Sequence, residues 1–207
     1  MIRNIVFDVG SVLMQVRPAE AMTDLGFDKD KAETTIKATL GNPVWRELDR
    51  GIMQKEDVFA ALKKGLAPEI QAGIDFFFEK AVWNFVKPFP YTRNWLASLK
   101  ERGYKIFLLS NYPAWLWTVN EKNAFNFLDL IAGKVVSGFE QLIKPDPAIY
   151  QLLLSRYSLS APECVFLDDM AENVIGARKE GINAIQFESF EQANGQLEEI
   201  LKAQPAK

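Results

Sequence analysis

The chain has 207 residues, of which 48% are hydrophobic and 25% are charged, and its formal net charge is -3. This length and composition are typical of a globular protein with one core, or with one core carrying an insertion, and the acidic balance argues against a nucleic-acid-binding surface. The sequence holds no histidine and a single cysteine, Cys164, which excludes Ser-His-Asp and Cys-His nucleophile systems, histidine-ligated zinc and an intramolecular disulfide framework.

Two further features bear on where the protein works. No apolar run is long enough to cross a bilayer, and Asp8 interrupts the N-terminal apolar run before it reaches the length of a signal peptide. A lone cysteine suits a reducing compartment. We therefore expect a cytoplasmic protein with no membrane or nucleic-acid partner, present as a monomer or a homodimer.

The first 90 residues are predicted to form one strand followed by helices. Residues 2–9 are an apolar run of strand character, ended by Gly10 and Ser11. Proline, aspartate and glycine then mark helix starts and ends. They predict helices over residues 18–26, from 28 or 30 to 41, 43–50, 54–66 and 68–86, with no strand pattern in that stretch. Residues 87–90 (Lys-Pro-Phe-Pro) are typical of a linker.

Strands and helices alternate in the rest of the chain. Trp95, Leu96 and Leu99 stand at helical spacing before Gly103. The pattern that follows predicts strands over residues 104–109, 134–137, 164–167 and 183–187, and helices over 113–122, 147–157 and 171–180. The tail beyond Leu201 is expected to fray. The alternation predicts an α/β fold with a Rossmann-like, parallel sheet core of residues 1–16 plus 88–207. Residues 17–87 form an all-helical insertion in this prediction.

Polar side chains follow four of the predicted strands. Each is ordinary by itself, because aspartates and Ser-Asn pairs are common in turns and a lysine before proline is usually on the surface. In an open α/β sheet, however, ligands bind at the carboxyl ends of the strands. We therefore expect the following side chains to gather at one edge of the sheet: Asp8, Ser110 with Asn111, Lys144, and Asp168 with Asp169.

Such a group of side chains could carry out phosphoryl transfer without histidine. Asp8 and Asp169 offer hard carboxylate oxygens to Mg²⁺, and Asp168 would hold a metal-bound water or position Asp169. The second Asp8 oxygen would attack phosphorus and form an aspartyl-phosphate. Lys144 and the ion would neutralise the phosphoryl oxygens, to which the Ser110 hydroxyl would donate.

The segments that carry these residues resemble the motifs of the haloacid dehalogenase superfamily, in the branch with a helical cap inserted after the first motif. The matching segments are residues 7–13, 109–111, 144–145 and 166–173. The resemblance implies a phosphatase that needs Mg²⁺, and a small phosphoester substrate, with a sugar phosphate as the best guess. It implies catalytic roles for Asp8 and Lys144, phosphate binding by Ser110, Asn111 and Lys144, and metal binding by Asp8, Gly10 (through its carbonyl), Asp168 and Asp169.

Position 10 departs from the pattern of that superfamily. Its first motif normally reads Asp-x-Asp, and the second aspartate is the general acid and base, whereas this chain has Gly10. General acid–base help is worth roughly 10²–10⁴-fold in rate, so its loss slows the reaction without forbidding it. Related bacterial sugar-phosphate phosphatases also carry glycine here, and a metal-bound water or the substrate's own phosphate could replace the missing acid.

The glycine leaves two other functions open. One is a catalytically weak or inactive protein that binds a phosphorylated ligand and acts as a regulator. That role gives no chemical reason to keep the Asp8 carboxylate, which repels phosphate unless a metal is present. The other is a 2-haloacid dehalogenase, whose family also lacks the second aspartate. Because those enzymes need no metal, they would leave the Asp168–Asp169 pair without a purpose, so we disfavour this reading.

Substrate selection is assigned to the cap, residues 17–87, which closes over the site in this family. Residues 15–17 and 87–90 are the two chain crossings and hence the expected hinges. Trp45, Arg46 and Asp49 are candidates for contacts with the leaving group, and Tyr112 and Trp115 for the mouth of the site. The competing interpretation is that the cap aromatics, Trp45 among them, pack between helices, and that Arg46 and Asp49 form a solvated helical face.

Overall fold

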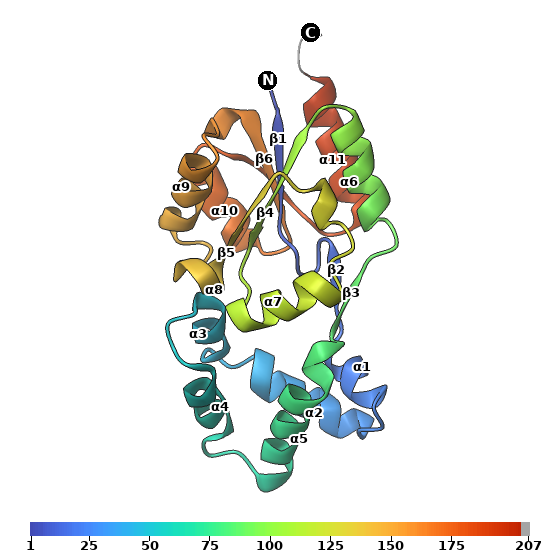
Figure 1. The fold of residues 1–207 in the computed structure, drawn as a ribbon, viewed down its shortest axis with the longest axis vertical. Coiled ribbons are helices and arrows are strands. Elements are labelled where there is room, and N and C mark those ends of the chain that lie inside the picture. The colour runs from blue at the N-terminus through green and yellow to red at the C-terminus, as the bar shows by residue number, and fades with distance from the viewer. Residues whose placement is uncertain (204–207) are drawn as a thin grey trace.

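Five short strands form one parallel sheet in the computed structural model, which describes residues 1–203 (Figure 1). The strands lie in the order β5-β4-β1-β6-β7, and every neighbouring pair is parallel. All residues of β1 and β6 are buried, as expected for a sheet covered on both faces. The bounds are β1 (Asn4–Phe7), β4 (Lys105–Ser110), β5 (Gly133–Val136), β6 (Cys164–Asp168) and β7 (Asn183–Gln186). The predicted α/β fold class is confirmed.

The register of the strands aligns their carboxyl ends. Phe7 at the end of β1 lies level with Leu108 of β4 and with Leu167 of β6. The residues that follow these three strands therefore lie at the same edge of the sheet, with the end of β1 between the ends of β4 and β6. This arrangement is the one that the sequence predicts.

Helices cover both faces of the sheet, and the two faces bury separate apolar clusters. Successive strand side chains point to opposite faces, so Ile5 and Phe7 belong to one cluster and Val6 to the other. The helices α6 (Thr92–Glu101) and α11 (Phe190–Lys202) contribute to the first cluster, and α9 (Pro147–Arg156) and α10 (Ala171–Lys179) to the second. Figure 1 shows these two pairs on opposite sides of the sheet. Two more helices, α7 (Ala114–Asn123) and α8 (Ser137–Glu140), follow β4 and β5, and the 3-10 turns are η2 (Leu128–Leu130) and η3 (Ala161–Glu163).

The inserted segment forms a second layer made of five helices and a 3-10 turn. Their starts and ends follow local chemistry: prolines open α1 and α5, the Asp28 side chain accepts from the Lys31 N–H at 3.0 Å at the start of α2, and Gly51 ends α3 in the left-handed conformation. Aromatic rings pack between the helices, with Phe59 and Phe78 centroids 3.6 Å apart. The bounds are α1 (Pro18–Thr23), α2 (Lys29–Leu40), α3 (Trp45–Arg50), α4 (Lys55–Lys63), α5 (Pro68–Glu79) and η1 (Ala81–Trp83).

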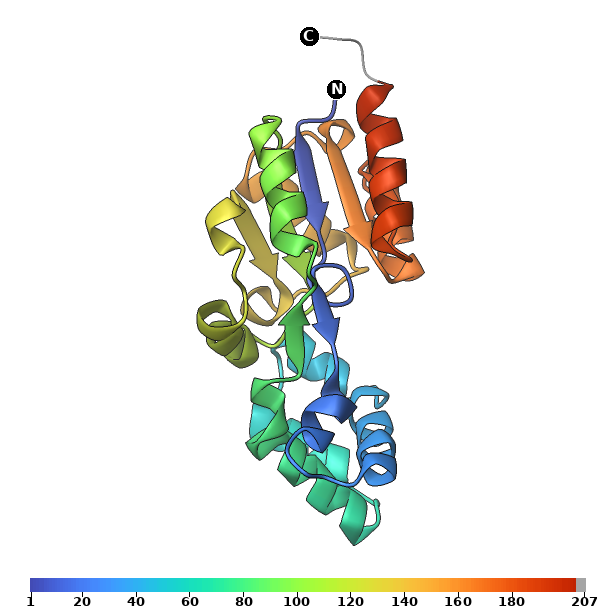
Figure 2. The same cartoon turned by 90° about the vertical axis from the view of Figure 1, so that its right-hand side faces the viewer.

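The two crossings between the layers pair with each other, which the sequence did not predict. Here β2 (Met14–Val16) runs antiparallel to β3 (Val86–Pro88), and Figure 2 shows this pair between the sheet and the helices. The helix predicted over residues 68–86 therefore ends at Glu79, and part of the predicted linker is a strand. The strand forms at Val86 because its backbone pairs with that of Val16, a residue far away in the sequence.

Two helices were also missed. One is the single turn of α8, and the other is α11, whose buried residues Ala193, Leu197 and Leu201 recur every four positions. The Ser189 hydroxyl caps α11 by accepting from the Gln192 N–H at 3.2 Å. Of the tail expected to fray, residues 204–207 lie outside the described residues. None of the described helices is long and apolar enough to span a membrane.

Candidate active site

Three carboxylates meet at the carboxyl edge of the sheet. The Asp8 N–H donates to the Leu167 carbonyl at 2.9 Å, so the ladder between β1 and β6 continues one residue further and holds Asp8 beside Asp168. Oxygens of Asp8, Asp168 and Asp169 lie within 4.8 Å of one another. Asp8 and Asp168 are buried and Asp169 is half-buried. The strand ends thus bring together the acidic residues that the sequence singled out.

Lys144 lies among these carboxylates, with only 1% of its surface exposed. Its Nζ is 2.8 Å from Asp8 Oδ1 and 2.6 Å from Asp168 Oδ2, and it donates to the Leu109 carbonyl at 2.8 Å. These contacts use all three donors of the ammonium group. Burial alone would lower the pKa of Lys144, but the Asp168 and Asp8 carboxylates outweigh it and hold the pKa above its ordinary value. The usual expectation of a surface lysine before proline does not apply here.

Asp168 is fully buried and engaged by several donors. Its Oδ1 accepts from the Met170 N–H at 2.8 Å and from Asn173 Nδ2 at 2.9 Å, and its Oδ2 also accepts from Asn173, at 3.1 Å, as well as pairing with Lys144. This arrangement suits a residue that positions Lys144. Asn173, in the first turn of α10, was not singled out in the sequence, and its position one turn after Asp168-Asp169 is the signal that could have found it.

Asn111 fixes the backbone on the other side of the site. Its Nδ2 donates to the Lys144 carbonyl at 3.1 Å, and its Oδ1 accepts from the Lys144 N–H at 2.9 Å. This reciprocal pair joins the end of β4 to the loop that carries Lys144. The side chain that was expected to bind phosphate is therefore engaged with the protein, although Asn111 also lines the cavity described below.

The Ser110 hydroxyl is buried without a partner. The residue is 1% exposed, and its Oγ has no hydrogen-bond partner among residues 1–203. Leaving a buried hydroxyl unsatisfied costs about 1–3 kcal/mol, so such groups in folded proteins call for an explanation such as a ligand or a water. The position of this hydroxyl at the end of β4, one strand away from Asp8, suits a donor to a bound anion.

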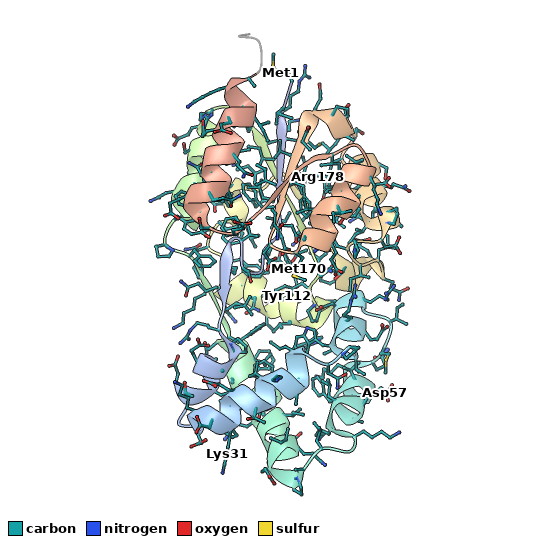
Figure 3. The ribbon with its side chains drawn as sticks, turned by 180° about the vertical axis from the view of Figure 1, so that it is seen from behind. Met1, Lys31, Asp57, Tyr112, Met170 and Arg178 are labelled. Atoms are coloured by element: carbon teal, nitrogen blue, oxygen red, sulfur yellow. The ribbon has the colours of Figure 1, made fainter. Side chains whose placement is uncertain are left out.

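A cavity of 470 Å³ lies between the sheet edge and the inserted helices. The core lines it with Asp8, Gly10, Lys144 and Asp169, and α3 lines it with Trp45, Arg46 and Asp49. A smaller pocket of 160 Å³ adjoins it and shares Asp8, Trp45 and Asp49, with walls that include Tyr112 and Leu116. Figure 3 shows Tyr112 and Met170 at the level where the two layers meet.

The cavities bring together most of the residues expected at the mouth of the site. Trp45 lines both cavities and also stacks on Phe78, with ring centroids 6.0 Å apart, so it fits both interpretations given above. Tyr112 is nearly buried, and its hydroxyl accepts from Asn120 Nδ2 at 2.7 Å. Trp115 lines neither cavity among the described residues, and its ring contacts Trp83 edge-on.

The helix α3 contacts the core directly through α8 (Figure 1). The Ser137 hydroxyl donates to the Asp49 carbonyl and accepts from the Tyr112 N–H at 2.8 Å. Close by, a Cβ on Gly51 would lie 2.4 Å from the Gly138 carbonyl oxygen, so the two backbones touch where only glycine fits. Across the mouth, Arg46 and Glu172 form an exposed ion pair at 3.9 Å. The inserted helices therefore contact the core directly beside the cavity.

Comparison with known proteins assigns the chain to a family. The model of the haloacid dehalogenase-like hydrolases matches residues 2–181. The chain belongs to this family. It is 25% identical over 178 residues to the sesquiterpene phosphatase astK of Aspergillus oryzae, across 86% of this chain and 85% of that protein.

Solved structures of the same fold include enzymes of two kinds. The HAD family enzyme BT-2542 of Bacteroides thetaiotaomicron, in complex with magnesium and inorganic phosphate, has a TM-score of 0.68 at 21% identity, over 93% of this chain and 98% of that one. The L-2-haloacid dehalogenase of Xanthobacter autotrophicus, with chloropropionic acid covalently bound, has a TM-score of 0.67 at 20% identity, over 100% of this chain and 85% of that one. At these identities the likeness shows the fold.

The carboxylates of this haloacid dehalogenase-like hydrolase carry more negative charge than its lysine balances. Burial raises the pKa of Asp8 to about 7, with Asp168 and Asp169 adding to the rise and Lys144 opposing it. Burial and Asp168 likewise raise the pKa of Asp169. Lys144 supplies one positive charge against three clustered carboxylates, which is the electrostatic situation that a hard divalent cation relieves. The donor set therefore fits Mg²⁺.

Proposed function

We propose that this hydrolase is a Mg²⁺-dependent phosphomonoesterase of small phosphorylated metabolites that acts through an aspartyl-phosphate on Asp8. The observation that carries the proposal is the position of the Asp8 carboxylate. It lies at the wall of a 470 Å³ cavity, with Lys144 2.8 Å from one of its oxygens and the Asp168–Asp169 pair within 4.8 Å.

Each residue of the group has a role in this proposal. Asp8 attacks phosphorus with one carboxylate oxygen, and the bond to the leaving alcohol breaks. Lys144 offsets charge on the phosphoryl oxygens, and Ser110 gives its unpartnered hydroxyl as a donor. Mg²⁺, held by Asp8, Asp169 and the Gly10 carbonyl, would supply electrostatic stabilisation of the transferred group. Asp168 holds Lys144 in place through their ion pair. Because Asp169 is the next residue in the chain, the contacts that fix Asp168 also help to position Asp169.

The inserted helices are proposed to act as a cap. We take residues 17–87 as the cap domain and residues 1–16 plus 88–207 as the core, with the β2–β3 pair as the connection between them. A 470 Å³ cavity is of the size that binds a small metabolite. Arg46 and Asp49 on α3 offer polar contacts to a leaving group, which suits a sugar phosphate.

A second substrate class is favoured by the walls of the smaller pocket. Its apolar side chains include Val16, Leu40, Phe85 and Leu116, which would bind a short alkyl or alkenyl group better than a sugar hydroxyl. The sesquiterpene phosphatase among the relatives is named for an apolar substrate. Sugar phosphates and short-chain alkyl phosphates should therefore be compared in one substrate panel.

The proposal is tested by hydrolysis of p-nitrophenyl phosphate, with Mg²⁺ and with chelator, by the wild type and Asp8→Asn. Asp57→Asn is the matched control, because Asp57 is an exposed aspartate on α4, away from the cavity (Figure 3). We expect turnover that needs Mg²⁺, survives in Asp57→Asn and vanishes in Asp8→Asn. Wild-type turnover no higher than that of Asp8→Asn, with this reporter and with the whole phosphate panel, would reject the enzyme and favour a phosphate-binding regulator.

A further inference from the structure

Position 10 carries no carboxylate, so a proton donor supplied by the protein itself has to come from another position in the chain. Among the described residues, the carboxylates that line the 470 Å³ cavity are Asp8, Asp49, Asp169 and Glu172. Asp8 is the nucleophile and Asp169 belongs to the proposed metal cluster. Glu172 is about half exposed and paired with Arg46 at 3.9 Å. Asp49 remains.

Asp49 faces the reaction site from the cap side. It lines both the larger and the smaller cavity, as Asp8 does, so the two carboxylates border the same space. No hydrogen bond or ion pair engages the Asp49 carboxylate within residues 1–203, whereas its backbone carbonyl is held by the Ser137 hydroxyl. The backbone is anchored and the side chain is free to act on a ligand.

The contact between the cap and the core holds the backbone around Asp49. Gly51, two residues further along, packs its backbone against Gly138 so closely that a Cβ would lie 2.4 Å from the carbonyl oxygen. The same Ser137 hydroxyl that holds Asp49 also accepts from the Tyr112 N–H at 2.8 Å. The backbone at Asp49 is therefore held against the core.

We propose that Asp49 is the general acid and base of the reaction, a catalytic residue that the cap supplies in place of the carboxylate missing at position 10. This inference rests on the proposed phosphatase function. It also means that the proton donor is present only while α3 is docked on α8, which couples the chemistry to closure of the cap.

Protons and bonds balance over the two half-reactions. In the first, Asp8 forms a bond to phosphorus, the bond from phosphorus to the leaving oxygen breaks, and that oxygen takes the proton of the Asp49 carboxyl. In the second, the Asp49 carboxylate takes a proton from water, whose oxygen attacks phosphorus. The bond between Asp8 and phosphorus then breaks, phosphate leaves, and Asp49 is protonated again.

The electrostatics of the pocket suit this role. Burial raises the pKa of Asp49 to about 7, and the charge of Asp8 adds to the rise, while Lys144 and Arg46 oppose it. A carboxyl group with such a pKa is available both as acid and as base near neutral pH, the condition under which general acid–base catalysis works best.

The test compares two substrates of similar shape that differ in how much protonation their leaving groups need. Nitrophenolate leaves without a proton, whereas the more basic phenolate of phenyl phosphate benefits from one. The wild type, Asp49→Asn and the control Asp57→Asn are assayed with both, in Mg²⁺, and thermal melting checks that each variant is folded. For Asp49→Asn we expect kcat/KM to fall roughly 10²–10⁴-fold for phenyl phosphate and less than about 10-fold for p-nitrophenyl phosphate.

A burst experiment addresses the second half-reaction. With p-nitrophenyl phosphate, Asp49→Asn should release one nitrophenolate per enzyme quickly and then turn over slowly, because the aspartyl-phosphate lacks a base for its hydrolysis. An equal loss on both substrates without a burst, while the wild type remains active and Asp8→Asn inactive, would overturn the role of Asp49 alone. A wild type that hydrolyses neither substrate would overturn the phosphatase proposal and this inference with it.

Discussion

Replacing Lys144 with methionine removes a buried charge and keeps most of the side-chain volume. In the wild type the ammonium lies 2.8 Å from Asp8 and 2.6 Å from Asp168, at 1% exposure. Removing one partner of a buried ion pair costs about 3–5 kcal/mol, because the other charge stays buried without compensation. Asp168 keeps its hydrogen bonds from Met170 and Asn173, so we expect a loss of about 3 kcal/mol, at the lower end of that range.

The measurement is the free energy of unfolding in urea, in chelator at pH 8, with Lys63→Met as the matched control. The Lys63 ammonium lies at the same distance, 2.8 Å, from an oxygen of Asp75, but this pair is partly exposed to solvent. Exposed pairs contribute about 0–1 kcal/mol. Equal losses in the two variants would refute the view that Lys144 offsets the charge of buried carboxylates.

The pH dependence gives a second check on the same variant. Asp8 has its pKa raised from 3.8 to about 7 in the folded protein, and loss of Lys144 should raise it further. A carboxyl group whose pKa is raised on folding binds more protons in the native state, so stability falls as pH rises through this window. The deficit of Lys144→Met relative to the wild type should be largest above pH 7 and shrink towards pH 4, and a deficit that grows on acidification would contradict the assignment.

Four further outcomes are expected. In chelator, Asp8→Asn should unfold at higher urea than the wild type at pH 8, and this gain should disappear near pH 4, because the ionised carboxylate with a folded pKa of about 7 is what destabilises the fold. Thermal melting should rise on Mg²⁺ titration in the wild type and stay flat in Asp169→Asn, and an equal rise in both would remove Asp169 from the metal site. Ser110→Ala should lower kcat/KM roughly 10-fold yet leave stability unchanged or about 1 kcal/mol higher, as removal of an unsatisfied buried hydroxyl predicts, and urea unfolding beside the kinetics separates the two effects. Adding Gly10→Asp to Asp49→Asn should partly restore hydrolysis of phenyl phosphate, since a Cβ at position 10 meets its nearest atom at an ordinary 3.5 Å. No gain at all would count against the view that a carboxylate at position 10 and Asp49 can fill the same acid–base role.

The inserted helices contact the core at the residue that the Ser137 hydroxyl holds, Asp49. The Ser137 hydroxyl, the glycine backbones and the Arg46–Glu172 pair join the two layers around the mouth of the cavity. The exposed Arg46–Glu172 pair contributes little by itself, so the glycine contact and the buried Ser137 hydroxyl are the interactions expected to hold the layers together.

The parallel sheet, the polar residues at its strand ends and the motifs that contain them could be predicted from the sequence. Apolar runs such as Ile5–Phe7 and Val165–Leu167 predict buried strands, and parallel strands must place Asp8 and Asp168 at one edge. Most helix starts and ends were likewise local, because proline, glycine and capping aspartates act within one turn. These features depend on neighbours in the chain and can be read from it.

Features that depend on contacts between distant segments could not be predicted from the sequence. The β2–β3 pair joins Val16 to Val86, the Asn111 amide binds the backbone of Lys144, and Lys144 is buried instead of solvated. Asp49, an ordinary helical aspartate in the sequence, comes to share a cavity with Asp8 because Ser137, 88 residues away, holds its backbone. Burial and electrostatic environment are properties of the packed molecule, so the carboxylate proposed as general acid and base can be identified only from the tertiary structure, in which the inserted helices contact the core.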